Sequence, residues 1–252
     1  MSRRPFRWQP GVWLAALLLL PVGIVQAAAD ATVARIAVYR GEAGCPGCSE
    51  AVQAAIERQG PRYRVDFVGP DEAVDVTEVT RERYVAYVQP GGGQDIQGAF
   101  AALGDAQAAA IGDFVEGGGR FIGLCMGAYL AGASYLGLLP QDLDAEAGRP
   151  GFPVHGIDDA AVPVQWNGRQ ESAFFQDGPY LPSAGAAPGF RVIARYANGD
   201  LAAARYAHGK GVVVLTGPHP EAPPQWFDEA EIPRSQMPRS DLFKDVLDAS
   251  LR

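Results

Sequence analysis

Hydrophobic positions along the chain form short apolar runs that alternate with longer, Ala-rich amphipathic segments. The runs predict buried strands and the segments between them predict crossover helices, so the pattern indicates an α/β protein with a mostly parallel sheet. The predicted strands are Arg35–Tyr39, Tyr63–Val68, Tyr84–Gln89, Arg120–Leu124, Val192–Tyr196 and Val212–Thr216. The predicted helices are Ser49–Gln59, Gly98–Leu103, Ala106–Glu116, Met126–Leu136 and Asp241–Leu251.

The pattern changes between Pro140 and Gly189, where Gly, Pro, Asp and aromatic residues accumulate. Strand-like pieces at Val162–Trp166 and Ala173–Gln176 predict a β-rich insertion that covers one end of the sheet. Asn198-Gly199-Asp200 predicts a hairpin turn, which would make the last strands antiparallel neighbours. Pro223–Pro238 is predicted to be a surface loop.

The N-terminus resembles an export signal. Arg3, Arg4 and Arg7 precede an uncharged run from Gly11 to Ala27, so residues 1–27 are expected to be a signal peptide, with an uncleaved anchor as the alternative. The two adjacent arginines also resemble the twin-arginine form of such signals. We expect the domain that follows, residues 30–252, to be exported to the periplasm or the extracellular space.

Composition and charge fit one large globular domain and narrow the choice of partner. The chain is 48% hydrophobic and 20% charged. Removing residues 1–27 takes away three arginines and no acid, which changes the net charge from −8 to −11. An acidic domain argues against nucleic acid or anionic lipid as the partner. We therefore expect a small-molecule or peptide-like substrate and no stable membrane insertion after processing; the sequence indicates no oligomeric state.

The segment from Phe121 to Tyr129 is typical of a nucleophile elbow. A strand runs into a helix through Gly123-Leu124-Cys125-Met126-Gly127, and the two glycines allow the close backbone contacts that expose a nucleophile at the turn. The helix N-terminus favours the thiolate form of a cysteine placed there. Cys125 is therefore the candidate nucleophile, with a small buried hydrophobic residue as the alternative interpretation.

Two further segments supply the groups that such a nucleophile needs. His219 follows the strand Val212–Thr216 and is itself followed, two residues on, by Glu221, which gives a base and a group to orient it. Pro90-Gly91-Gly92-Gly93 exposes backbone N–H groups that could bind an anion. The residues after these glycines lack the Lys and Ser or Thr of a phosphate loop, so an oxyanion hole is the better interpretation.

Together these motifs resemble the class I glutamine amidotransferase-like superfamily, and within it the family named for the N-terminal domain of eukaryotic biotin–protein ligase. The resemblance implies a flavodoxin-like three-layer α/β/α sandwich. No cofactor is expected. It implies that Cys125 is the nucleophile, His219 the base and Glu221 the orienting group. The implied oxyanion donors are the N–H groups of Gly92 or Gly93 and Met126. The segments that carry the resemblance are 87–93, 117–129, 177–179 and 217–221.

One position departs from the family pattern. Glutamine-hydrolysing members have Gln two residues after the second glycine of the elbow, where this chain has Tyr129. This puts glutamine in doubt as the substrate. The expected function is an exported, amidotransferase-like cysteine hydrolase that acts on an amide or related acyl bond of unknown substrate. The alternatives are a non-catalytic binding protein on the same fold and a thiol-redox protein.

Cys45-Pro46-Gly47-Cys48 lies between the first predicted strand and the first predicted helix. A CxxC pair in this context can be redox-active, can form a structural disulfide or can bind a metal. Two cysteines without a second pair are a weak zinc signal, so no metal site is expected. In a flavodoxin-like sheet this loop emerges at the same edge as the elbow. We therefore expect Cys45 and Cys48 to lie within side-chain reach of the Cys125 pocket.

Overall fold

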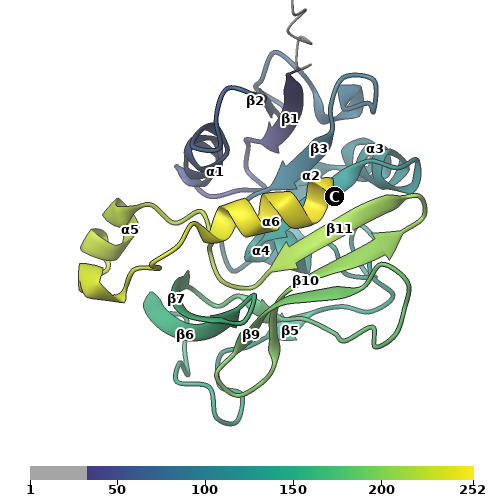
Figure 1. Cartoon of the computed structure of the whole chain (residues 1–252). Coiled ribbons are helices and arrows are strands. Elements are labelled where there is room, and N and C mark those ends of the chain that lie inside the picture. Colours follow the sequence, from purple (N-terminus) through teal and green to yellow (C-terminus); the bar gives the residue numbers. More distant parts are fainter. Residues whose placement is uncertain (1–32) are drawn as a thin grey trace, which may run out of the picture. The chain divides into compact units, whose positions relative to one another are not determined.

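A computed structural model of the protein describes residues 33–252, so the expected signal over residues 1–27 lies outside the described part. Five parallel strands form one half of a nine-stranded sheet, in the order β2-β1-β3-β4-β11 (Figure 1). This is the flavodoxin-like arrangement expected from the sequence. The strands are β1 (Ala34–Tyr39), β2 (Tyr63–Val68), β3 (Ala86–Gln89), β4 (Arg120–Leu124) and β11 (Gly211–Thr216).

Helices cover both faces of this parallel half, because alternate strand residues point to opposite sides. Ile36 and Val38 pack in one cluster with residues of α1 and α6, whereas Ala37 and Tyr39 pack in a second cluster with residues of α2 and α3. The three-layer sandwich is thereby confirmed. The helices are α1 (Cys48–Glu57), α2 (Ile96–Leu103), α3 (Asp105–Glu116) and α6 (Leu242–Leu251), with a 3-10 turn, η1, at Val76–Glu78.

The second half of the sheet is antiparallel and continues from β11 in the order β10-β9-β6-β7. The hairpin expected at Asn198-Gly199 joins β9 to β10, and Gly199 has a φ of 97°. A second hairpin turns at Asn167 and Gly168, both with positive φ, as a two-residue turn between strands requires. These strands are β6 (Ala160–Trp166), β7 (Arg169–Phe175), β9 (Arg191–Tyr196) and β10 (Leu201–His208).

The insertion after Pro140 therefore does more than cover an end of the sheet. Its strands β6 and β7 extend the sheet beyond β9, and β7 begins at Arg169, four residues before the expected Ala173. Two short strands of the same region, β5 (Asp144–Ala145) and β8 (Pro179–Tyr180), form a separate two-stranded sheet.

Two helical segments differ from expectation. The helix after the elbow, α4, spans only Met126–Tyr129 and not Met126–Leu136. The chain leaves the helix because Gly132 packs against Asp142, whose carboxylate accepts hydrogen bonds from the backbone and side chain of Ser134. The expected loop 223–238 contains a short helix, α5 (Pro224–Glu229), that begins at a proline, and a 3-10 turn, η2 (Arg234–Gln236).

Candidate functional site

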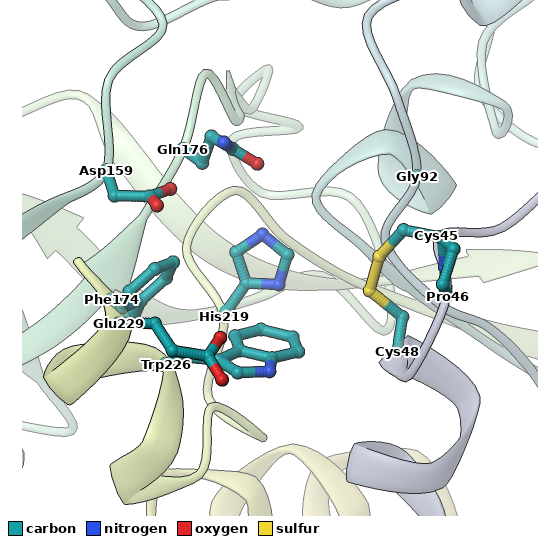
Figure 2. A pocket seen from close by; sticks show the side chains of 10 residues that line it. All are labelled: Cys45, Pro46, Cys48, Gly92, Asp159, Phe174, Gln176, His219, Trp226 and Glu229. Carbon is teal, nitrogen blue, oxygen red and sulfur yellow. A yellow bond between two sulfur atoms is a disulfide. The ribbon is translucent and has the colours of Figure 1, made fainter.

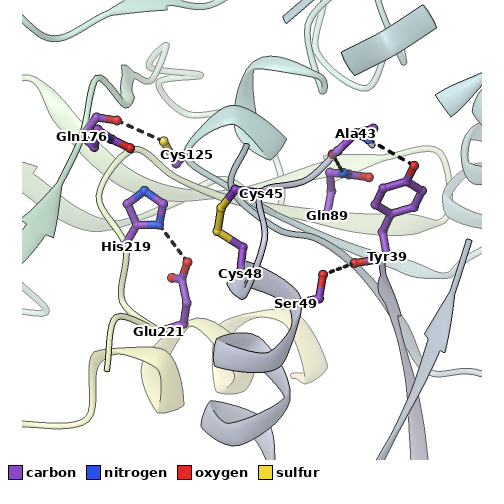
Figure 3. Close-up of a disulfide and its surroundings, with 10 residues drawn as sticks. All are labelled: Tyr39, Ala43, Cys45, Cys48, Ser49, Gln89, Cys125, Gln176, His219 and Glu221. Atoms are coloured by element: carbon purple, nitrogen blue, oxygen red, sulfur yellow. Dashed lines mark hydrogen bonds and ion pairs between the residues drawn. A yellow bond between two sulfur atoms is a disulfide. The ribbon is translucent and has the colours of Figure 1, made fainter. Parts of the chain in front are cut away.

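Four loops that carry candidate residues meet at the carboxyl edge of the parallel strands (Figure 3). Gln89 at the end of β3 is paired with Gly123, and Leu124 at the end of β4 is paired with Thr216 of β11. Because these strands are parallel and in register, the segments that follow them emerge side by side. The glycine loop, Cys125 and His219 therefore arise from neighbouring strands.

Cys125 occupies the turn between β4 and α4 in a conformation that side chains rarely adopt, with φ 50° and ψ −113°. The glycines on either side make this turn possible. A Cβ on Gly123 would lie 2.5 Å from the carbonyl oxygen of Gly127, and a Cβ on Gly127 would meet the carbonyl oxygen of Gln89. The strained backbone at a nucleophile position matches the elbow geometry that the sequence predicts.

The Cys125 side chain is 5% exposed and is held from two sides. Its backbone N–H donates to the carbonyl oxygen of Thr216 at 2.9 Å, which ties the elbow to the end of β11. Its thiol donates to the carbonyl oxygen of Gln176 at 3.2 Å. The sequence did not single out Gln176, although the neighbouring 177–179 segment is one of the motifs that carry the family resemblance.

His219 and Glu221 form a buried pair. Nδ1 of His219 lies 2.8 Å from Oε1 of Glu221; the two residues are 6% and 0% exposed (Figure 3). The His219 backbone N–H donates to the carbonyl oxygen of Phe174, and the imidazole packs edge-on against Phe174 and Trp226. The ring orientation is therefore fixed by one ionic contact and two aromatic neighbours.

The pKa of His219 lies well above its ordinary value. Burial acts to lower it, but the electrostatic effects of Cys125 and Glu221 and their hydrogen bonds to the ring outweigh burial and stabilise the imidazolium. Oε2 of Glu221 is buried without a hydrogen-bond partner within residues 33–252. Only Oε1 of this carboxylate therefore bonds to the imidazole.

Gly91 lies beside both His219 and Cys125. A Cβ at this position would lie 2.7 Å from Cε1 of His219 and 3.7 Å from Cβ of Cys125. The glycine backbone is therefore close to both side chains, and a side chain at this position would collide with the imidazole. The sequence predicted the importance of this loop, but it assigned the site to Gly92 and Gly93.

Two pockets open beside these groups and share Gly92 and Gln176. The first, of about 150 Å³, is lined by His219, Phe174, Trp226, Asp159 and the Cys45–Cys48 pair (Figure 2). The second, of about 160 Å³, is lined by residues that include Cys125 and all three expected oxyanion donors, Gly92, Gly93 and Met126. In the described part of the chain, the N–H groups of these three residues donate to no protein acceptor. They are available to a ligand in the pocket.

The loop that carries Cys45 and Cys48 is fastened to the glycine loop. Cys45 and Cys48 form a disulfide, and the Cys45 N–H donates to the carbonyl oxygen of Gly91 at 3.0 Å (Figure 3). The disulfide lines the pocket beside His219. The structure therefore brings the pair to the pocket beside His219, whereas Cys125 lines the second pocket.

A buried hydrogen-bond network supports this loop from below (Figure 3). The amide of Gln89, which is fully buried, donates to the carbonyl oxygen of Ala43 at 2.6 Å and accepts from the hydroxyl of Tyr87 at 2.7 Å. The hydroxyl of Tyr39 accepts from the Ala43 N–H, and Ser49 donates to the Tyr39 carbonyl oxygen. A fully paired network of this kind fixes the loop on the end of β3.

The insertion supplies the remaining walls of the site. Gly178 and Gly217 meet backbone to backbone, which brings the end of β7 against the end of β11. Tyr129 faces the second pocket and donates from its hydroxyl to the carbonyl oxygen of Asp177 at 2.9 Å. Near this wall, burial raises the pKa of Glu146 to about 7, although Asn198 donates a hydrogen bond to its carboxylate. Sequence reasoning missed Glu146 because no predicted strand or motif includes it.

Within residues 33–252, no group of three or more His, Cys, Asp or Glu side chains is arranged to hold a metal ion. Over the same residues, no helix combines the length and the apolar character that crossing a membrane requires.

Comparisons with known proteins agree with the family resemblance. Residues 34–136 match the family described as biotin-protein ligase, N terminal. The structure resembles PurLQS from Thermotoga maritima, with a TM-score of 0.59 and 17% identity over 86% of this chain and 97% of that one. It also resembles a glutamine amidotransferase, with a TM-score of 0.50 and 17% identity over 78% of this chain and 99% of that one. No curated protein matches the sequence. The resemblance to glutamine amidotransferase-like proteins and their fold is confirmed.

Proposed function

We propose that the protein is an exported, amidotransferase-like cysteine hydrolase that cleaves an amide or related acyl bond. The observation that carries this proposal is the arrangement around Gly91. A cysteine on a strained elbow and an imidazole paired with a buried carboxylate both lie within 4 Å of where a Cβ on this glycine would stand. A cysteine-based acyl-transfer site consists of a nucleophile, a base that accepts its proton and a group that orients the base.

The proposed reaction assigns one role to each group. Cys125 turns from its hydrogen bond with Gln176, passes its proton to Nε2 of His219, and attacks the carbonyl carbon. The oxyanion that forms is stabilised by the free N–H groups of Met126 and of Gly92 or Gly93. His219 then protonates the leaving amine, and water hydrolyses the thioester. Glu221 holds Nδ1–H throughout and stabilises the imidazolium, in agreement with the raised pKa of His219.

The residue at position 129, Tyr129, gives information about the identity of the substrate. It stands where glutamine-hydrolysing relatives have Gln, and its hydroxyl is bound to the insertion at Asp177. This supports an acyl substrate other than glutamine, a small molecule or a peptide that fits a pocket of about 160 Å³. We propose that the protein acts alone on this substrate and outside the cytoplasm. The Cys45–Cys48 disulfide supports an oxidising compartment.

The test combines thiol reactivity with hydrolysis. Iodoacetamide alkylation of Cys125 is followed by mass spectrometry at graded pH, and a panel of amides, esters and thioesters is screened for turnover. Cys125→Ala and His219→Gln should abolish turnover, and His219→Gln should slow alkylation.

Matched controls separate the site from general damage to the fold. His155→Gln changes an exposed histidine that does not line either pocket and should leave both readouts unchanged. If Cys125 in the native protein reacts no faster than in the urea-unfolded chain, the hydrolase proposal is overturned and the non-catalytic binding protein remains.

A further inference from the structure

The disulfide occupies an unusual place for a purely structural bridge. Cys45 and Cys48 line the same pocket as His219, and Figure 2 shows the two sulfurs along one wall with the imidazole between them and Asp159. Cys45 is partly exposed, whereas Cys48 is 2% exposed. A molecule that enters this pocket therefore reaches the Cys45 side of the bond first.

The bridge also adds little to the fold. A disulfide stabilises mainly by closing a loop in the unfolded chain, and a separation of three residues closes one of the shortest loops there is. The loop is held independently by the Cys45 N–H bond to Gly91, by Gln89 and by Ser49. The two cysteines would therefore remain next to each other after reduction.

We propose that the Cys45–Cys48 disulfide is a reactive site that exchanges with neutral or cationic thiols, a function separate from hydrolysis at Cys125. An incoming thiol loses its proton to solvent and its sulfur attacks Sγ of Cys45. The disulfide bond breaks, its electron pair leaves on Sγ of Cys48, and a mixed disulfide forms on Cys45. A second thiol attacks that mixed disulfide, so that two thiols are oxidised to one disulfide while the pair is reduced to two thiols.

The position of Cys48 suits it to be the leaving group. It is the first residue of the ten-residue helix α1, whose N-terminal N–H groups stabilise an anion. A better leaving group speeds thiol–disulfide exchange. The acidic side chain in the first turn, Glu50, is paired with Arg40 at 3.1 Å, which offsets its charge.

The pocket sets the preference for the charge of the thiol. Asp159 and Glu229 place two carboxylates on its wall, and among residues 33–252 no Lys or Arg lines it. His219, whose pKa is raised in part by Cys125, offsets part of this negative charge when its ring is protonated. A thiolate that also carries an ammonium group, as in cysteamine, is therefore favoured over one that carries a second negative charge, as in mercaptoacetate.

The experiment measures exchange in the Cys125→Ser variant, where only the pair can react. If that variant does not fold, the wild-type protein with Cys125 blocked by iodoacetamide replaces it. Rates with cysteamine, 2-mercaptoethanol and mercaptoacetate are each divided by the rate of the same thiol with the urea-unfolded chain. The mixed disulfide is trapped with N-ethylmaleimide and located by peptide mapping. Because Cys125 takes no part, failure here leaves the hydrolase proposal untouched.

We expect the mixed disulfide on Cys45, and a normalised rate for cysteamine that exceeds that for mercaptoacetate by about tenfold at low salt. The difference should shrink at high salt and in Asp159→Asn or Glu229→Gln, but not in Glu57→Gln, an exposed acid on α1 outside the pocket. Exchange slower in the folded than in the unfolded protein, a mixed disulfide on Cys48, or equal normalised rates for all three thiols would each overturn the proposal.

Discussion

Replacing Gly91 by alanine would place a methyl group against the imidazole of His219. The new Cβ would lie 2.7 Å from Cε1, whereas ordinary contacts begin near 3.4 Å, so the ring must move by about 0.7 Å or the loop must yield. The ring has little freedom, because Glu221 holds Nδ1 and Phe174 and Trp226 pack against its sides. We expect a stability loss of about 1–3 kcal/mol and a retained fold.

The same displacement should separate the base from the nucleophile. A misplacement of about 1 Å in a catalytic site can lower the rate by roughly 100-fold. The effect can be measured without a substrate, as the rate at which iodoacetamide alkylates Cys125 at pH 7. Two reference variants give the upper and lower ends of the expected range of rates. Gly93→Ala is the matched control, because a Cβ at that position meets nothing within 4 Å, and it should react like the wild type. Gly91→Ala should fall toward the rate of His219→Gln. Equal rates and pH profiles for the two alanine variants would refute the geometry around Gly91.

Three further outcomes are expected. Burial raises the pKa of Glu146 to about 7 in the folded state from an ordinary 4.5, so folding is progressively disfavoured as the pH rises between these values. Glu146→Gln should therefore raise the free energy of unfolding by up to about 3 kcal/mol at pH 8 but by less than about 1 kcal/mol at pH 5, and an equal effect at both would contradict this account. Glu221→Gln keeps an acceptor for Nδ1 but removes a charge, so NMR titration should show a lowered pKa for His219; an unchanged pKa would mean that the carboxylate charge is unimportant. Tyr87→Phe leaves a buried acceptor on β3 unpaired and should cost about 1–3 kcal/mol in urea unfolding, while the partly exposed Tyr135→Phe should cost nothing measurable.

The parallel half of the protein could be predicted from sequence because four of its five strands, β1, β3, β4 and β11, are mostly buried and read as apolar runs. β2 and β4 begin and end where expected, and the turn between β9 and β10 uses the glycine of the Asn198-Gly199 pair at a positive φ. The same reasoning overextended α4, because the packing of Gly132 against Asp142 depends on residues that follow the helix. It also missed the full length of β7, where exposed polar residues begin the strand.

Part of the candidate site could likewise be predicted from the sequence, and part could not. Cys125, His219 and Glu221 could be predicted, because the elbow turn and the two-residue spacing from His219 to Glu221 each have a structural reason. The structure brings all three residues to one edge of the sheet. Gly91 could not be distinguished from its two neighbours, because three successive glycines look alike until the position of the imidazole is known. Gln176 could not be found either, since it contributes a backbone carbonyl oxygen, which every residue type has.

The backbone contact between Gly178 and Gly217 has a consequence for how far the two halves of this protein can change independently. The candidate reactive groups come from the ends of the parallel strands, whereas part of the pocket walls comes from the 140–189 insertion, and the two parts meet at this pair of glycines. Exchanging the insertion would alter the reacting groups as well as the walls, because Gln176 accepts from the Cys125 thiol and Phe174 accepts from the His219 N–H.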